Sequence, residues 1–215
     1  MKKPRVLMAD DHSLILAGLR KLVEAECEVV GAVEDGRALV EAAQTLRPDL
    51  ILMDISMPLL NGLDAARQLR KLVPESKVIF LTMHASPTYA TEAFQAGASG
   101  YLLKRSAASE LSLAIKSVLQ GQHYLTPSLT KDVLESVLKP STGEAVTVPS
   151  ATLTARQREV LQLVAEGHGT KEIATILDVS VKTVEFHKSR IMQLLNLHTT
   201  ADLTKYAITH GITGL

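Results

Sequence analysis

Three aspartates, a threonine and a lysine follow short apolar runs, at positions where buried strands would end. Asp10 and Asp11 follow VLMA, and Asp54 follows LILM. Thr82 closes the run VIFLT, and Lys104 closes GYLLK. Together these side chains supply a carboxylate nucleophile, acidic ligands for a divalent cation, and a hydroxyl and an ammonium that donate to oxyanions. Phosphoryl transfer to a side chain needs these groups.

A single such residue carries little weight, because one aspartate at the end of a strand is usually a turn or cap residue. Four strand ends with matching chemistry are much less expected by chance. Carboxylates gathered at one edge disfavour ionisation unless a cation neutralises them. Because carboxylate-rich oxygen ligation suits Mg²⁺, we expect Asp10, Asp11 and Asp54 to bind this ion.

The elements that would position these residues alternate through about residue 120. Five runs are apolar at consecutive positions, which is typical of strands buried on both faces, and amphipathic stretches lie between them. The runs are RVLMA, CEVVGAV, DLILMDI, KVIFLTM and GYLLK. We expect a doubly wound, five-stranded parallel (βα)5 domain, in which ligands collect at the carboxyl ends of the strands.

The pattern changes after His123, where a short helical signal and then the stretch STGEAVTVPS follow. That stretch is rich in Pro, Gly, Ser and Thr and indicates a linker. The rest of the chain carries four helical signals joined by short turns. We therefore expect an α/β domain over residues 1–123, a linker with a short helix over 124–150, and a four-helix, all-α domain over 151–215.

Composition sets broad limits on the function. The chain has 215 residues, of which 46% are hydrophobic, and its 23 basic and 23 acidic residues give zero net charge. Binding to nucleic acid must therefore come from a local patch. The lone Cys27 excludes a disulfide framework, and no apolar run is long enough for a signal peptide or a membrane span. We expect a cytoplasmic protein without a membrane partner.

The third helical signal of the last region, SVKTVEFHKSRIMQLLN, has two faces. Apolar spacing predicts a buried stripe of Val184, His187, Ile191 and Leu195. The other face is polar, and in a helix-turn-helix it would contact DNA. A plain helical bundle with a solvated face fits equally well, because residues 145–215 hold seven basic and six acidic residues. The DNA-contact candidates are Lys182, Glu185, Phe186 and Ser189 toward the bases, with Lys188 and Arg190 nearer the phosphates.

Four segments resemble, in order and spacing, the receiver domain of two-component response regulators: DDH at 10–12, MDISMPLLNG at 53–62, LTMHA at 81–85 and GYLLK at 100–104. The resemblance implies specific roles for residues at the strand ends. Those roles are Asp54 as the phospho-acceptor, Asp10 and Asp11 as the acids that hold Mg²⁺, Thr82 and Lys104 as phosphoryl contacts, and Thr82 with Tyr101 as the switch.

The segment LTARQREVLQLVAEGHGTKEIATILDVSVKTVEFHKSRI resembles the LuxR-type DNA-binding module, and its coupling to a receiver is the layout of the NarL/FixJ class. Three positions depart from residues common in that family: Thr170 replaces Asn, Leu194 replaces Lys, and Thr200 replaces Arg. Glu185 stands where many members have Lys. Because an acid accepts from cytosine N4 whereas Lys favours guanine, we expect a different operator preference.

The two resemblances imply a transcription factor that a cognate histidine kinase phosphorylates and that binds a double-stranded DNA operator as a homodimer. Its own acyl phosphate is open to hydrolysis, but we expect no turnover of an external substrate. An aspartyl-phosphate phosphatase is the first alternative, but it would want an acid two residues after Asp54, where Ser56 stands. A pure protein-interaction module is the second, and it would leave the outer face of residues 182–193 without a purpose.

Overall fold

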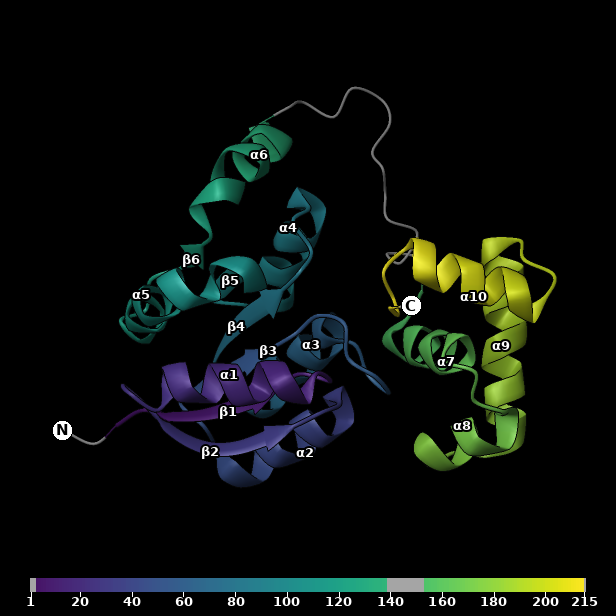
Figure 1. Ribbon diagram of the computed structural model, residues 1–215. Helices are drawn as coiled ribbons and strands as arrows, with labels where there is room; N and C mark the ends of the chain where they lie inside the picture. The colour runs from purple at the N-terminus through teal and green to yellow at the C-terminus, as the bar shows by residue number, and fades with distance from the viewer. Residues whose placement is uncertain (1–2, 139–152, 215) are drawn as a thin grey trace. The chain divides into compact units, whose positions relative to one another are not determined.

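The computed structural model describes residues 3–138 and 153–214, which form two compact units that are considered separately (Figure 1). The expected linker at 141–150 lies outside the described residues. In the part of the chain that is described, every helix is too short or too polar to cross a membrane.

The first unit alternates strands and helices, which confirms the expected α/β architecture. Its strands are β1 (Arg5–Ala9), β2 (Glu28–Val33), β3 (Leu50–Met53), β4 (Lys77–Thr82), β5 (Gly100–Leu103) and β6 (Tyr124–Leu125). Its helices are α1 (Ser13–Val23), α2 (Gly36–Leu46), α3 (Gly62–Leu72), α4 (Pro87–Ala96), α5 (Ala107–Leu119) and α6 (Pro127–Leu138), with a 3-10 turn, η1 (Lys104–Ser106), after β5.

The strands form one parallel sheet in the order β2-β1-β3-β4-β5-β6. Helices α1 and α5 cover one face, and α2, α3 and α4 cover the other (Figure 1). The strand order reverses between β1 and β3, and in such sheets this switch point opens a crevice at the carboxyl ends. Asp10 and Asp54 follow these two strands directly.

The sheet has one strand more than the five that the sequence predicted. Tyr124 and Leu125 pair in parallel with Gly100 and Tyr101 on β5. A two-residue strand is too short to show an apolar pattern, so its pairing depends on the neighbouring strand. The domain boundary after residue 123 stays a prediction, although this strand and the packing of α6 against α4 tie the following segment to the sheet.

The strands are apolar at consecutive positions because helices cover both faces of the sheet. Alternate side chains of each strand point to opposite layers. Toward α1 and α5, the layer contains Met8, Leu52, Leu81 and Leu102, all of them buried. A core packed this closely is hard to deform, so it holds the end of each strand in a defined position.

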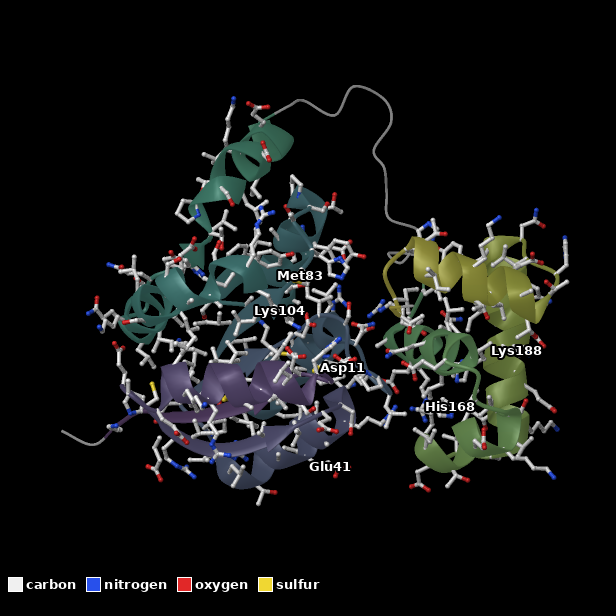
Figure 2. All side chains as sticks on the ribbon, viewed as in Figure 1. Asp11, Glu41, Met83, Lys104, His168 and Lys188 are labelled. Atoms are coloured by element: carbon white, nitrogen blue, oxygen red, sulfur yellow. The ribbon has the colours of Figure 1, made fainter. Side chains whose placement is uncertain are left out.

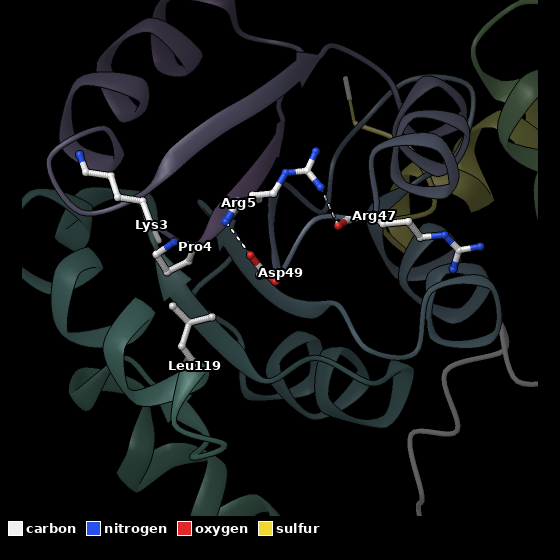
Figure 3. A pocket seen from close by; sticks show the side chains of 6 residues that line it. All are labelled: Lys3, Pro4, Arg5, Arg47, Asp49 and Leu119. Atoms are coloured by element: carbon white, nitrogen blue, oxygen red, sulfur yellow. Dashed lines mark hydrogen bonds between the residues drawn. The ribbon is translucent and has the colours of Figure 1, made fainter. Parts of the chain in front are cut away.

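A pocket of about 530 Å³ lies at the opposite, amino edge of the sheet (Figure 3). Its basic side chains all bind backbone carbonyls at helix ends. Lys3 donates to carbonyls just past α1, Arg5 to the last carbonyl of α2, and Arg47 to the last carbonyl of α3. Cations are favourable there because the helix dipole is negative at that end. These residues therefore stabilise the C-terminal ends of α1, α2 and α3, which lie at the amino edge of the sheet.

Over its described residues 153–214, the second unit contains four helices, as the sequence predicted: α7 (Ala155–Ala165), α8 (Thr170–Ile176), α9 (Val181–Leu195) and α10 (Thr200–Thr209). Helix α7 packs against α9 and α10, and α8 packs against α9. Thr154 and Gln157 form a capping box at the start of α7. Ser180 caps α9 by accepting from the Thr183 N–H, so the expected N-cap is confirmed.

Candidate functional site

Two carboxylates and an ammonium meet at the carboxyl edge of the sheet. Lys104 Nζ lies 2.7 Å from Asp10 Oδ2 and 2.7 Å from Asp54 Oδ2. The lysine side chain is 7% exposed, and both carboxylates are buried more deeply. Figure 2 shows Lys104, Asp11 and Met83 at this same edge. The structure therefore brings together residues that the sequence supplies from three separate strand ends.

Asp54 is held by its backbone and by both carboxylate oxygens. Its N–H donates to Ala9 O at 3.0 Å, and its Oδ1 accepts from the Ile55 N–H at 2.6 Å. Burial raises the pKa of Asp54, Lys104 opposes that rise, and the charge of Asp10 adds to it. Burial alone would lower the pKa of Lys104, but hydrogen bonds to Asp10 and Asp54 outweigh it and raise that pKa. The lysine is therefore held as a cation.

An acidic rim lies between β1 and the start of α1. The ligand atoms of Asp10, Asp11 and His12 all lie within 4.8 Å of one another. Asp11 is exposed, and its Oδ1 lies 2.8 Å from His12 Nδ1. Asp10 Oδ1 accepts from the His12 N–H at 3.0 Å. Asp54 is not in this group; it joins Asp10 through Lys104.

These residues fit a small dication. Three carboxylates against one ammonium leave two negative charges, which one Mg²⁺ would balance. Among the described residues, Lys104 Nζ at 2.7 Å is the one partner of the buried Asp10 Oδ2. Asp10 and Asp11 therefore lie together as oxygen donors, while Asp54 lies across Lys104 from Asp10, and Mg²⁺ binding by all three stays a prediction.

The two residues of the expected switch both bind the backbone of His84. Thr82 is fully buried at the end of β4, and its Oγ1 accepts from the His84 N–H at 3.2 Å. Tyr101 is also fully buried, and its hydroxyl donates to His84 O at 2.7 Å. Burial raises the pKa of Tyr101 far above its ordinary range, so the hydroxyl keeps its proton. The ring of Tyr101 thus lies inside the unit.

The side chain of His84 makes a second set of contacts. Its Nε2 lies 3.0 Å from Ser56 Oγ, and its ring stacks on Tyr89 with centroids 4.4 Å apart. Met83, the residue before it, is 70% exposed. The sequence did not predict this role for Tyr89, because Tyr89 lies on α4, after the loop that follows Thr82, and not at a strand end. The loop after β4 is therefore tied to the loop after β3 beside Asp54.

Gly62 allows α3 to begin directly against the backbone of Asp54. A Cβ at this position would collide with the Asp54 carbonyl oxygen and would approach Ile55 Cα at 2.9 Å. The Gly62 N–H donates to Ile55 O at 2.7 Å. The sequence indicated only a turn glycine here, whereas the structure shows a packing role, because only a residue without a Cβ lets α3 begin this close to the Asp54 backbone.

In the second unit, α9 presents the polar face that the sequence predicted. The base-facing candidates are all exposed: Lys182, Glu185, Phe186 and Ser189. Val184 and Ile191 are buried on the opposite side, and His187 is half-buried. Phe186 is 66% exposed on this face.

The two candidates for phosphate contacts both engage neighbours on the surface. Lys188 Nζ donates to Thr200 Oγ1 at 3.0 Å, and Arg190 Nη1 lies 3.4 Å from Gln193 Oε1. Such contacts between exposed side chains are weak and exchange readily with an anion. Thr200, at the position where the family often has Arg, thus binds Lys188 instead of supplying a charge.

Two family models match the chain. Residues 6–116 match the response regulator receiver domain, and residues 151–207 match the luxR family of bacterial regulatory proteins. The response regulator UvrY of Escherichia coli strain K12 is 35% identical over 209 residues, covering 96% of this chain and 94% of UvrY.

Two solved structures of RcsB are similar over nearly the whole chain. One, of the Salmonella typhimurium protein and described by its conformational dynamism for DNA interaction, has a TM-score of 0.64 and 29% identity, covering 98% of this chain and 99% of that one. The other holds two RcsB dimers on two parallel DNAs, with a TM-score of 0.59 and 28% identity, covering 95% and 98%.

The raised pKa of Asp54 predicts a pH-dependent effect of removing its charge. The folded chain binds this proton more tightly than the unfolded chain, so stability falls as the pH rises above the unfolded value of about 3.9. We expect Asp54→Asn to raise the free energy of unfolding at pH 7 without divalent ions. The gain should shrink as the pH falls toward 3.9, as denaturant titrations will measure.

The matched control is Asp132→Asn, which removes an exposed carboxylate from α6. We expect it to leave stability unchanged at each pH. An Asp54→Asn chain that is less stable than wild type at pH 7 would contradict the assigned electrostatics.

Proposed function

The chain belongs to the two-component response regulators that join a receiver domain to a LuxR-type DNA-binding domain, and from this premise we propose how it is controlled. It is a transcription factor. A cognate histidine kinase phosphorylates Asp54 in the presence of Mg²⁺, and the acyl phosphate controls DNA binding. The observation that carries this proposal is the buried Asp54 carboxylate, whose Oδ2 accepts from Lys104 at 2.7 Å. Because operator DNA lies in the bacterial cytoplasm, the chain works there.

In the proposed reaction, a carboxylate oxygen of Asp54 attacks the phosphorus of a phosphohistidine. A new O–P bond forms, the P–N bond breaks, and the imidazole leaves with the electron pair. Lys104 can then donate to a phosphoryl oxygen in place of the carboxylate. Bound by Asp10, Asp11 and Asp54, Mg²⁺ would neutralise phosphoryl charge. Hydrolysis of this acyl phosphate restores the carboxylate, with no turnover of an external substrate.

The same contacts support a switch that starts at Thr82. A phosphoryl group adds about 1.5 to 2 negative charges and three strong acceptors. Thr82 can donate its O–H to a phosphoryl oxygen, and an inward movement to reach that oxygen would pull Oγ1 away from the His84 N–H that it now accepts from. Because Tyr101 is bonded to His84 O, movement of this turn would also move the tyrosine. The loop before α4 would then report the state of Asp54.

The exposed face of α9 supports the proposed DNA contact. Lys182, Glu185 and Ser189 lie on one side of a capped helix whose opposite side is buried, so they are free to meet base edges. Lys188 and Arg190 would serve the phosphates. A homodimer would present two such helices to two half-sites, as a two-fold operator requires.

Phosphate incorporation tests the role of Asp54. Incubation with acetyl phosphate and Mg²⁺ should add one phosphoryl group to wild type and none to Asp54→Asn, as weighed by intact-protein mass spectrometry. The mass should return to its starting value after the donor is removed, as the acyl phosphate hydrolyses. Equal incorporation in both chains would remove Asp54 from this role, and omission of Mg²⁺ provides the control for the cation.

Substitutions on α9 separate phosphate contacts from base contacts. Arg190→Ala should weaken binding to every sequence and lower the slope of log affinity against log salt by about 0.9. Glu185→Ala should instead relax the preference at one base pair, by roughly 1 to 3 kcal/mol. Selection from a random DNA pool followed by salt titration measures both. Lys131→Ala, at an exposed position on α6, is the control. An unchanged motif for Glu185→Ala would refute its base contact.

Dimerisation should follow modification of Asp54. Moving a two-state population from 1:99 to 99:1 takes about 5.5 kcal/mol, more than one or two new hydrogen bonds supply. A second subunit with its own half-site contacts can provide the rest. Sedimentation with Mg²⁺ and beryllofluoride, a phosphoryl mimic, should show a dimer and tighter operator binding for wild type but not for Asp54→Asn. A chain that stays monomeric on DNA would refute this step.

A further inference from the structure

Thr126 is a fully buried polar residue between β6 and α6. Its backbone N–H donates to Tyr101 O at 3.0 Å, and its Oγ1 accepts from the Leu103 N–H at 3.1 Å. One residue therefore bonds to β5 at two positions, on either side of Leu102. Tyr101 belongs to the proposed switch, and Leu103 is the residue directly before Lys104.

The hydroxyl of Thr126 accepts a hydrogen bond from β5 beyond the end of the short strand β6. The β6 strand ends at Leu125, and the Leu103 N–H on β5 accordingly takes a side-chain acceptor, Thr126 Oγ1. Leu103 is 1% exposed, so water does not replace that acceptor. A buried N–H without a partner is costly, so the hydroxyl secures the last residue of β5.

Thr126 also connects β5 to α6. Its carbonyl accepts from the Leu129 N–H at 2.9 Å in the first turn of the helix, and Leu129 is buried. Helix α6 in turn packs against α4, as Figure 1 lets the reader follow. The residue before Lys104, the switch tyrosine and the helix that leads out of the unit thus share one attachment point.

We propose that Thr126 is a positioning residue for phosphoryl transfer. Its hydroxyl fixes the end of β5 so that Lys104 stays between Asp10 and Asp54, and it couples that lysine to α6. The proposal rests on the proposed function of Asp54 as the acceptor. An ammonium that stabilises a phosphoryl group has to be held to within about 0.5 Å, and the residue before it is the nearest point at which to hold it.

Three single variants test this role. Thr126→Val keeps the shape of the side chain and removes the hydroxyl, Thr126→Ser keeps the hydroxyl, and Thr130→Val makes the same change at an exposed position of α6. With saturating acetyl phosphate and Mg²⁺, the maximal rate of Asp54 phosphorylation should fall about tenfold for Thr126→Val. Thr126→Ser should restore it, and Thr130→Val should match wild type.

A double variant separates positioning of Lys104 from a general structural role. If Thr126 acts through the lysine, Thr126→Val should have no further effect in a Lys104→Ala background. If Thr126 only supports the fold, Thr126→Val should lower the phosphorylation rate by the same factor in both backgrounds. Calorimetric titration with Mg²⁺ and beryllofluoride repeats the comparison without chemical turnover, so it remains readable if Lys104→Ala is phosphorylated too slowly to follow.

Amide hydrogen exchange supplies a readout apart from the chemistry. The Leu103 N–H should exchange faster in Thr126→Val than in wild type and should be protected again in Thr126→Ser. The positioning role would be overturned if Thr126→Val left the Leu103 exchange rate or the phosphorylation rate unchanged. It would also be overturned if Thr126→Val lowered the phosphorylation rate by the same factor with and without Lys104. Either result would leave Asp54 as acceptor. Equal phosphate incorporation in wild type and Asp54→Asn would instead overturn the proposed function, and this inference with it.

Discussion

Lys104 lies between two buried carboxylates, and the arrangement of the receiver edge depends on that ion pair. Removing three charged groups from water is costly, and their attraction offsets the cost only when the geometry is good. Here Nζ reaches an oxygen of Asp10 and one of Asp54 at 2.7 Å each. Loss of the lysine would leave two facing carboxylates in a site of low dielectric constant. The same arrangement suits an incoming phosphoryl group, which offers the lysine replacement acceptors.

Close backbone packing keeps that geometry in place. Gly62 lets α3 approach the carbonyl of Asp54, and Thr126 completes the hydrogen bonding of β5 just before Lys104. Both contacts are made to the backbone beside the charged side chains and not to the charged groups themselves. A close-packed interior transmits small displacements instead of absorbing them, which is the physical basis of the positioning role proposed for Thr126.

In the second unit the key element is an amphipathic helix, α9, with a capped N-terminus. Ser180 satisfies an N–H at the first turn of α9, and buried Val184 and Ile191 set the rotation of the helix about its axis. Rotation then decides which side chains remain outside. Lys182 and Glu185 lie on that exposed side, so the proposed DNA contacts and the buried core use opposite faces of one helix.

The sequence by itself determined the alternation of strands and helices, the four helices of the second unit and the strand-end positions of Asp10, Asp54, Thr82 and Lys104. These follow from local periodicity, since consecutive apolar runs and helical spacing depend on near neighbours in the chain. Only the tertiary structure decided that β6 joins the sheet, that Lys104 bridges Asp10 and Asp54, and that Thr126 bonds to the residue before that lysine. Each of these contacts joins residues far apart in sequence, and no local pattern encodes a distance between side chains that meet only after the sheet has formed.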